Sequence, residues 1–455
     1  MKGEGPAGIR APNRFIIDHL LKGTGGLAML LQAGKRAWML LLAFVLALLP
    51  ACSSGGKEAA GGEIVLTFWN GFTGPDGKDI KRIIDRFNEE HKGKIRVKSQ
   101  TMPWGEYYDK IRTVVASGQA PDVAVMHVDQ LPKQAKLGVI MPLDQYIEEF
   151  DLKEEEFLPS VWEAGIYEGK RYAIPLDVHP IGLYYNVDLL KEAGFDKPPT
   201  NLKEFLQVAE KTTKDTDGDG KIDQWGFPMP TLWPSGMIYF SVLHQMGGEA
   251  VSADGMKAMY NSPEGVRAAE LLKSFIFEHE VSPKNIQQDG EVTLFRQGKA
   301  AMHINGIWMI NAFKEQKGLN FDVAPLPTFG DKPATWAGSH NFVLPRQKET
   351  DPKRIEAAIT FIKYVADHSI EWAKAGQIPA KNSVRESEDF KQLEYQSRFA
   401  DVNTLVFPKP SPTYVDVWVP AEESLNKVLL GKEDAGKALK QAAEKGEKKA
   451  RAAAD

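Results

Sequence analysis

The feature that most constrains the fold is an alternation of short apolar runs and amphipathic segments that begins near Glu63. The apolar runs have the length and β-branched content of strands, and the segments between them carry apolar side chains at helical spacing. A strand–helix–strand–helix–strand order predicts a parallel sheet in an α/β domain. Strands are predicted at 64–68, 95–97 and 123–126, with helices at 80–87 and 107–115.

Ligands of open parallel sheets bind beyond the carboxyl ends of the strands. The loops that open at Trp69, at Pro103-Trp104 and at Met126 should therefore face one site. The later half is richer in helical patterns, at 202–209, 266–275 and 355–365. The tail from about 433 is rich in Ala, Lys and Glu, which predicts an exposed helix that frays at its end.

The N-terminal region predicts an export signal followed by a lipidation site. The apolar run 38–49 is shorter than the about 20 residues that span a bilayer, and Lys35-Arg36 precede it. Cys52, the chain's single cysteine, follows closely, so a peptidase could cut before it and leave its thiol for a lipid. We interpret 1–51 as a signal peptide, of which 1–28 could be an over-long gene start. The alternative is an uncleaved anchor with an incidental cysteine.

The segment around Cys52 resembles the lipobox of bacterial lipoproteins, and residues 52–62, rich in Ser, Gly and Ala, suit a lipidated flexible tether. We expect a monomer that is lipid-anchored to the outer face of the bacterial cytoplasmic membrane. With Cys52 modified, the thiol chemistry of disulfides, metal sites and catalysis is excluded.

The charge and the length of the chain narrow its possible ligands and the number of its domains. Residues 1–51 hold 6 of the 56 basic and 2 of the 61 acidic side chains, which leaves 50 and 59 and a formal charge of −9. Such an acidic chain has no electrostatic footprint for nucleic acid. The remaining roughly 400 residues exceed what one hydrophobic core usually sustains, so two domains are expected.

Three segments carry a resemblance to a known family. Residues 172–186 (YAIPLDVHPIGLYYN), 118–129 (GQAPDVAVMHVD) and 301–308 (AMHINGIW) occur in the order and spacing of family 1 extracellular solute-binding proteins. These are sugar-capturing components of ABC importers. The resemblance implies an α/β, two-lobed periplasmic-binding-protein-like fold of type II, with a ligand cleft between hinged lobes. It places the N-terminal lobe at 63–177 plus 337–372 and the C-terminal lobe at 178–336 plus 373–455.

A sugar needs flat aromatic platforms and polar groups in its ring plane. By the resemblance, Trp308 is a stacking aromatic, with Asn305 just before it. Trp233 lies in a Pro- and Gly-flanked loop, and Trp336 and His340 lie at the second crossover between lobes. Trp69, at the mouth of the first strand, is a further candidate with Asn70 and Thr73 as polar partners, although core packing explains Trp69 equally well.

The polar candidates are Asp129, Asp177 and His179. By the resemblance, Asp129 aligns with a carboxylate that accepts from sugar hydroxyls, and Asp177 is a hinge residue, a ligand contact or both. His179 stands where maltose-binding protein, the best-known relative, has a carboxylate. An imidazole donates or accepts depending on its protonation, so this departure puts maltose itself in doubt.

A separate motif over 215–223 predicts a structural Ca²⁺ site. The carboxylates of Asp215, Asp217, Asp219 and Asp223 occupy positions 1, 3, 5 and 9 of a calcium loop, and Lys221 supplies the position-7 carbonyl. Position 12 is a glycine, so the bidentate ligand is missing locally. The alternative is an acidic exposed turn.

These patterns predict a non-catalytic carbohydrate receptor that delivers a di- or oligosaccharide to an ABC permease, with no catalytic cofactor. One alternative keeps the fold but changes the ligand to a polyol phosphate or a peptide. Another is a secreted glycoside hydrolase, although the elbow, zinc and phosphate-loop motifs of common hydrolases are missing from the sequence.

Overall fold

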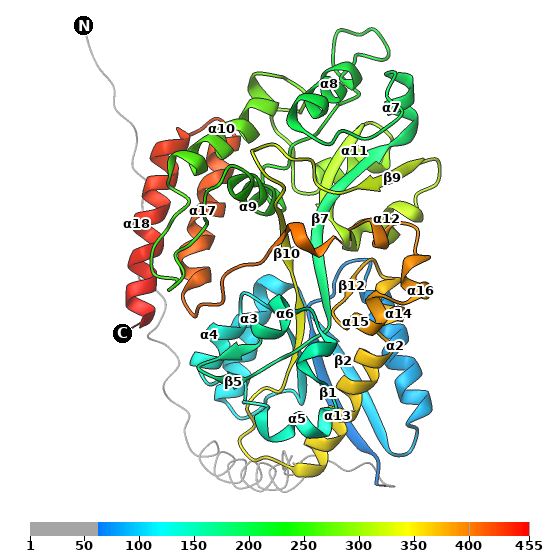
Figure 1. Cartoon of the computed structure of the whole chain (residues 1–455), viewed down its shortest axis with the longest axis vertical. Helices are drawn as coiled ribbons and strands as arrows, with labels where there is room; N and C mark the ends of the chain where they lie inside the picture. The colour runs from blue at the N-terminus through cyan, green and yellow to red at the C-terminus, as the bar shows by residue number, and fades with distance from the viewer. Residues whose placement is uncertain (1–61, 400, 455) are drawn as a thin grey trace, which may run out of the picture. The chain divides into compact units, whose positions relative to one another are not determined.

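A computed structural model describes residues 62–399 and 401–454, and its strands form two mixed sheets and a separate two-stranded hairpin (Figure 1). The predicted signal peptide, Cys52 and nearly all of the predicted tether lie outside the described residues. Within the described part, no helix combines the length and the apolar character needed to cross a membrane.

The first sheet has the strand order β2-β1-β3-β11-β6. β1 (Ile64–Asn70) pairs in parallel with β2 (Ile95–Thr101) and β3 (Val123–His127), which confirms the predicted parallel core. β11 (His340–Val343) then runs antiparallel to both β3 and β6 (Ile174–Pro175). These last two strands come from distant parts of the chain, and the local pattern did not reveal them.

The helices beside this sheet are amphipathic and bury one face each. α2 (Gly77–Glu90) buries its isoleucines and Phe87, while α3 (Trp104–Ala116) buries Tyr107 and Ile111. The ring of Phe68 in β1 lies 5.3 Å edge-on from Phe361 of α13 (Pro352–Asp367). Burying such aromatic rings contributes a large share of core stability.

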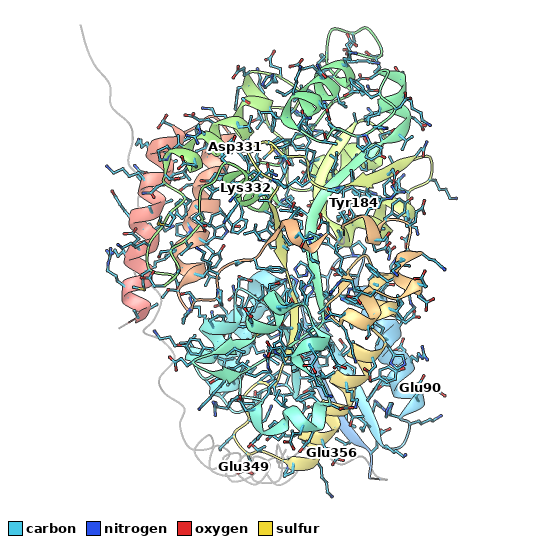
Figure 2. The ribbon with its side chains drawn as sticks, in the orientation of Figure 1. Glu90, Tyr184, Asp331, Lys332, Glu349 and Glu356 are labelled. Atoms are coloured by element: carbon cyan, nitrogen blue, oxygen red, sulfur yellow. The ribbon has the colours of Figure 1, made fainter. Side chains whose placement is uncertain are left out.

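The second sheet is organised around one long strand, β7 (Asp177–Asn186). Tyr184 of β7, labelled in Figure 2, is buried and donates a hydrogen bond to the Gly306 carbonyl at 2.7 Å. The other strands are β8 (Met302–Gly306), β9 (Phe321–Ala324), β10 (Thr335–Gly338) and β12 (Ile378–Pro379), all antiparallel to β7, and β13 (Leu405–Val406), which is parallel to β10.

The chain passes between the two sheets within very few residues. β6 ends at Pro175 in the first sheet and β7 begins at Asp177 in the second. β10 ends at Gly338 in the second sheet and β11 begins at His340 in the first. We call the first sheet with its helices the first lobe and the second sheet with its helices the second lobe. The exact lobe boundaries named above stay a prediction.

The helices predicted from the later half are present as α8 (Leu202–Thr212), α10 (Pro263–Phe277) and α13. Side chains cap the amino ends of two of the helices in the second lobe. Asn186 and Asn201 accept hydrogen bonds from the first-turn amides of α7 and α8. The remaining helices are α4 (Leu131–Lys136), α5 (Ile147–Phe150), α6 (Pro159–Glu163), α7 (Val187–Glu192), α9 (Ser235–Gln245), α11 (Gly290–Arg296), α12 (Ile310–Lys314), α14 (Ser369–Ala373), α15 (Asn382–Arg385), α16 (Glu388–Lys391), α17 (Tyr414–Leu429) and α18 (Ala435–Ala454).

The C-terminal tail corrects one expectation. It forms α18 as predicted, but the helix is not an exposed one, because it lies along α17 (Figure 1) and buries Leu439 together with a row of alanines. The small alanine side chains let the two helices approach closely. Charged residues occupy its outer face, and Lys445 forms an ion pair with Glu423 of α17.

His303 of β8 is a buried polar group that should make stability depend on pH. It is fully buried, and within the described residues neither ring nitrogen has a hydrogen-bond partner. Burial lowers the pKa of His303 to about 3. An unfolded histidine takes up its proton near pH 6.5. Because the unfolded chain takes up this proton before the folded chain does, the free energy of unfolding is not reduced by His303 above about pH 6.5. It decreases as the pH falls from there toward 3.

We expect His303→Phe to reduce the loss of unfolding free energy between pH 7 and pH 5 by about 2 kcal/mol relative to the unmodified chain. Phenylalanine keeps the stacking on Phe295 and removes the titrating group. Urea titrations at the two pH values measure the difference. Equal losses in both proteins would contradict the assignment.

Candidate functional site

The centre of the site is the carboxylate of Asp177, which is fully buried where the chain enters β7. It accepts hydrogen bonds from His179 Nδ1 at 3.0 Å, His340 Nδ1 at 2.8 Å, the His340 amide at 3.0 Å and Trp372 Nε1 at 2.6 Å. Burial alone would raise the pKa of Asp177, but the two histidines and their hydrogen bonds outweigh it and hold that pKa well below its ordinary value. The charged carboxylate therefore fixes the orientation of three rings.

A third imidazole, His127 at the end of β3, lies beside the other two. Its ring centroid is 5.0 Å from that of His340, and the rings of His340 and His179 are 4.2 Å apart. The hydroxyl of Tyr108 lies 2.9 Å from His127 Nδ1. Burial, and next the nearby His340, lower the pKa of both His127 and His179, the latter to about 4. Both rings are therefore neutral at neutral pH.

Aromatic rings continue from this cluster into both lobes. Trp104 of α3 lies parallel to His340 with centroids 5.8 Å apart. On the other side, Trp308 meets His179 edge-on at 5.7 Å and Trp233 lies 5.7 Å from Trp308. We call the series Trp104, His340, His179, Trp308 and Trp233 the aromatic band. It joins the first lobe to the second without a gap in ring-to-ring contact.

Glycines make this close approach possible. A Cβ on Gly71 would lie 2.1 Å from the Trp104 ring, and one on Gly306 would lie 2.0 Å from Trp308. A Cβ on Gly338 would lie 2.3 Å from His179 Nε2, in the strand that carries Trp336. The Trp336 ring is 5.9 Å from His179, so it flanks the band. Any larger residue at these positions would displace a ring.

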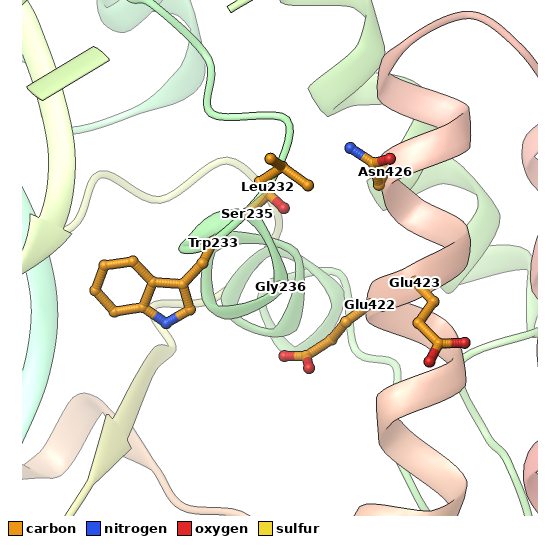
Figure 3. Close-up of a pocket in the computed structure, with 7 residues that line it drawn as sticks. All are labelled: Leu232, Trp233, Ser235, Gly236, Glu422, Glu423 and Asn426. Carbon is orange, nitrogen blue, oxygen red and sulfur yellow. The ribbon is translucent and has the colours of Figure 1, made fainter. Parts of the chain in front are cut away.

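The second-lobe end of the band opens on a cavity of about 340 Å³ (Figure 3). Trp233, a residue that is 46% exposed, forms one side of it, and Glu422 of α17 lies on another. Burial, with a smaller contribution from the charge of Asp129, raises the pKa of Glu422 to about 7. The remaining lining residues are Leu232, Ser235, Gly236, Glu423 and Asn426.

The structure brings together five of the predicted ligand residues, namely His179, Trp233, Trp308, Trp336 and His340. Asp177 lies behind them as the group that orients two imidazoles. Asp129, in the loop after β3, accepts a hydrogen bond from Gln130, and burial raises its pKa. Its charge also acts on Tyr414 and Glu422, so it faces α17 at the side of the site.

The four remaining predicted residues are not part of the ring-to-ring contacts of the band. Trp69 is 8% exposed and packs in the core between β1 and α3. Asn70 is fully buried, and its side chain bonds to Ser99, Thr101 and the Phe72 amide, which holds the loop in shape. Thr73 is exposed, and Asn305 is fully buried with its Oδ1 accepting from the Gly306 amide. The local pattern could not distinguish the buried positions of Trp69, Asn70 and Asn305 from ligand contacts.

The sequence reasoning did not name Trp104, His127 and Glu422 as site residues. A signal was present for Trp104, because the Pro103-Trp104 loop was expected to face the site. His127 ends a strand whose carboxyl end points to the same place. Glu422 lies in a helix far along the chain, and no local pattern connected it with Trp233.

The acidic loop 215–223 lies outside the band. One carboxylate oxygen from each of Asp215, Asp217 and Asp219 lies within 4.8 Å of the others. Asp215 accepts from the amides of Gly218 and Gly220, and the Gly220 amide in particular lowers the pKa of Asp215. Asp223 instead accepts from Thr216, through both its amide and its hydroxyl.

A family model for the bacterial extracellular solute-binding proteins matches residues 82–395, which include most strands of both sheets and the whole aromatic band. The chain belongs to this family. Its members are non-catalytic receptors, so this solute-binding protein is a receptor and not a glycoside hydrolase.

Relatives and solved structures agree with this membership. A galactooligosaccharide-binding protein of Bacillus subtilis is 27% identical over 92% of this chain and 99% of its own length. A maltooligosaccharide ABC transporter solute-binding lipoprotein of Streptococcus pneumoniae is 25% identical over 78% of this chain and 82% of its own. The maltose/maltodextrin-binding domain of Bdellovibrio bacteriovorus, solved with maltotriose, superposes with a TM-score of 0.75 at 24% identity, covering 85% of this chain and 100% of that one. That likeness shows the two-lobed α/β fold.

Proposed function

We propose that this solute-binding protein is the carbohydrate receptor of an ABC importer and that it captures a di- or oligosaccharide between its lobes. The observation that carries the proposal is the aromatic band, which runs unbroken from Trp104 in the first lobe to Trp233 in the second. Indole faces offer apolar stacking surfaces to the C–H faces of sugars, and the imidazole nitrogens between them can bond to hydroxyls. Relatives named for oligosaccharide binding support the same ligand class.

The charges around the band favour a neutral ligand over a phosphorylated one. The ionisable groups in or beside it include the carboxyl groups of Asp76, Asp129, Asp177 and Glu422 and the neutral rings of His127 and His179. A phosphate would instead need arginines or helix N-termini directed at it. A polyol phosphate or a peptide is therefore the less favoured ligand.

In the mechanism that we propose, the sugar contacts both lobes and shifts the population toward a closed form that docks on the permease. Side-chain contacts between the lobes would add to this closure. Lys133 Nζ of α4 lies 2.7 Å from Asp416 Oδ1 of α17, and Asn311 Nδ2 of α12 lies 3.2 Å from Asp79 Oδ2 of α2.

Titration calorimetry with a panel of galacto-, malto- and manno-oligosaccharides tests the ligand class. We expect at least one neutral sugar to bind and Trp308→Ala to weaken it by about tenfold or more, because the substitution removes the central stacking surface. Trp225→Ala is the matched control, since this half-buried tryptophan lies outside the band. If Trp308→Ala binds the sugar as tightly as the unmodified chain, Trp308 is not the stacking surface. If only phosphorylated ligands bind, the ligand is not a neutral sugar and the proposal is overturned.

We also propose that loop 215–223 binds a structural Ca²⁺ through Asp215, Asp217 and Asp219, with the Lys221 carbonyl and Asp223 completing the set. The clustering of three carboxylates and the glycines at the turn support this proposal. Millimolar Ca²⁺ should raise the melting temperature relative to a chelated sample. The shift should vanish in Asp217→Asn combined with Asp219→Asn, and the absence of any shift in the unmodified chain would contradict the site.

Finally, we propose that Cys52 carries the lipid anchor, which the resemblance to a lipobox supports. Cys52→Ser should move the protein from the membrane pellet to the soluble fraction of the cell envelope or the medium, because the thiol that receives the lipid is gone. Ser53→Ala is the control that leaves the thiol in place. Continued sedimentation of Cys52→Ser with membranes would instead favour an uncleaved N-terminal anchor.

A further inference from the structure

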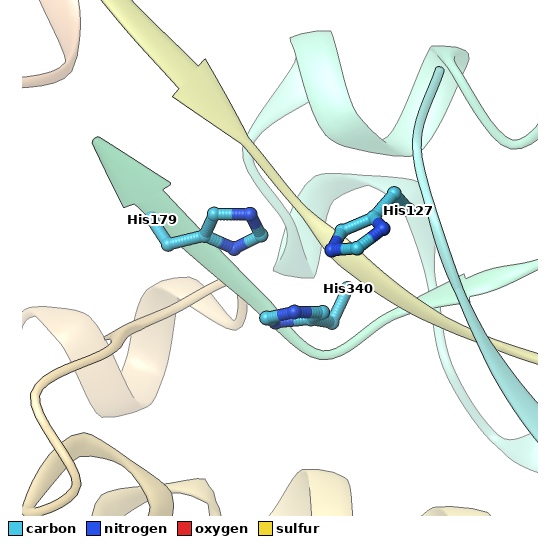
Figure 4. Close-up of side chains that lie close together, drawn as sticks. All are labelled: His127, His179 and His340. Carbon is cyan, nitrogen blue, oxygen red and sulfur yellow. The ribbon is translucent and has the colours of Figure 1, made fainter. Parts of the chain in front are cut away.

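We propose that His127, His179 and His340 form a binding site for a divalent transition metal of the Zn²⁺ class at the middle of the aromatic band. One ring nitrogen from each of the three histidines lies within 4.8 Å of the others (Figure 4). Metal binding at this cluster does not require a sugar, so the inference is independent of the proposed function.

Strand pairing accounts for the convergence of the three rings. His340 of β11 is directly opposite His127 of β3 in an antiparallel pair, so their side chains are neighbours on one face. His179 of β7 is opposite Gly338, two residues before His340. All three histidines are therefore held by sheet backbone, and sites built on strands are more precise than sites built on loops.

Hydrogen bonds to Nδ1 prepare the opposite nitrogen of each ring for a metal. Asp177 holds Nδ1 of His179 and of His340, and the Tyr108 hydroxyl lies beside Nδ1 of His127. Within the described part of the chain, no hydrogen bond occupies the Nε2 atoms. A carboxylate that holds the far nitrogen is the arrangement that orients histidine ligands of zinc and raises their basicity.

The chemistry of the donor set selects the metal class. Imidazole nitrogens suit Zn²⁺, Cu²⁺ and Ni²⁺ rather than Ca²⁺ or Mg²⁺, which prefer oxygen ligands. Zn–N distances of about 2.0–2.1 Å place ligating nitrogens roughly 3.4 Å apart, so nitrogens that lie within 4.8 Å of one another have to draw together by at most about 1.4 Å.

Three histidines leave one tetrahedral position open for water or for a ligand hydroxyl. The rings of Trp104, Trp308 and Trp336 lie next to the cluster, Trp104 beside His127 and the other two beside His179. A metal here would also tie β3 and β11 of the first lobe to β7 of the second.

The test is titration calorimetry of the purified full chain, without a histidine tag, with ZnCl₂ in a buffer that contains millimolar Ca²⁺ to saturate the acidic loop. We expect one Zn²⁺ per chain, and at least 100-fold weaker binding in His127→Gln and in His340→Gln. Asp177→Asn should weaken Zn²⁺ binding by about 10- to 100-fold, because it perturbs the orienting hydrogen bonds and leaves the ligands in place. His279→Gln, at a histidine that pairs with Glu210 away from the band, should bind as the unmodified chain does.

Unchanged Zn²⁺ affinity in His127→Gln would overturn the proposal, as would binding that is lost in Asp217→Asn instead. Circular dichroism and melting curves show whether each variant is folded. If the histidine variants do not fold, X-ray absorption of the Zn²⁺-loaded unmodified chain decides, since three imidazole ligands support the site and mainly oxygen ligands exclude it. Titration of the metal-free protein with sugar tests the carbohydrate proposal by itself, so that a failure of one proposal can be told from a failure of the other.

Discussion

The buried carboxylate of Asp177 holds together the part of the molecule on which the site depends. Four donors from β7, β11 and α14 converge on its two oxygens, and each donor would otherwise be buried without a partner. Charge-assisted hydrogen bonds of this kind are stronger and more directional than neutral ones. Because the donors come from both lobes, one side chain sets the geometry of the connection between sheets and the orientation of the rings that a ligand would meet.

The same region shows how small residues position large ones. Gly71, Gly306 and Gly338 each stand directly beneath an aromatic or imidazole ring, at distances that no Cβ tolerates. Ring-to-ring contact along the band therefore depends as much on these glycines, which have no Cβ, as on the tryptophans and histidines themselves. A bare count of tryptophans would not have located the band.

Much of the fold could be read from local patterns, and most of the site could not. Periodicity identified β1, β2 and β3 and the helices α2, α3, α8, α10 and α13, because each element shows its own burial pattern. Trp69 and Trp308 look alike in sequence, since each lies at or just after the carboxyl end of a strand, yet Trp69 packs in a core while Trp308 contacts His179 and Trp233. The difference arises from contacts between segments that are distant in the sequence. The meeting of His127 with His340 depends on an antiparallel register that no local pattern encodes.

The position of α18 has a consequence for the order in which the molecule is completed. Leu439, Ala442 and Ala443 cover the apolar face of α17, whose other contacts reach α9 and α10. Until these late residues have emerged from the ribosome, that apolar face stays uncovered and the interior of the second lobe is unfinished. α18 thus completes the packing of α17, so that a nascent chain gains this part of its cooperative stability only after α18 has been translated.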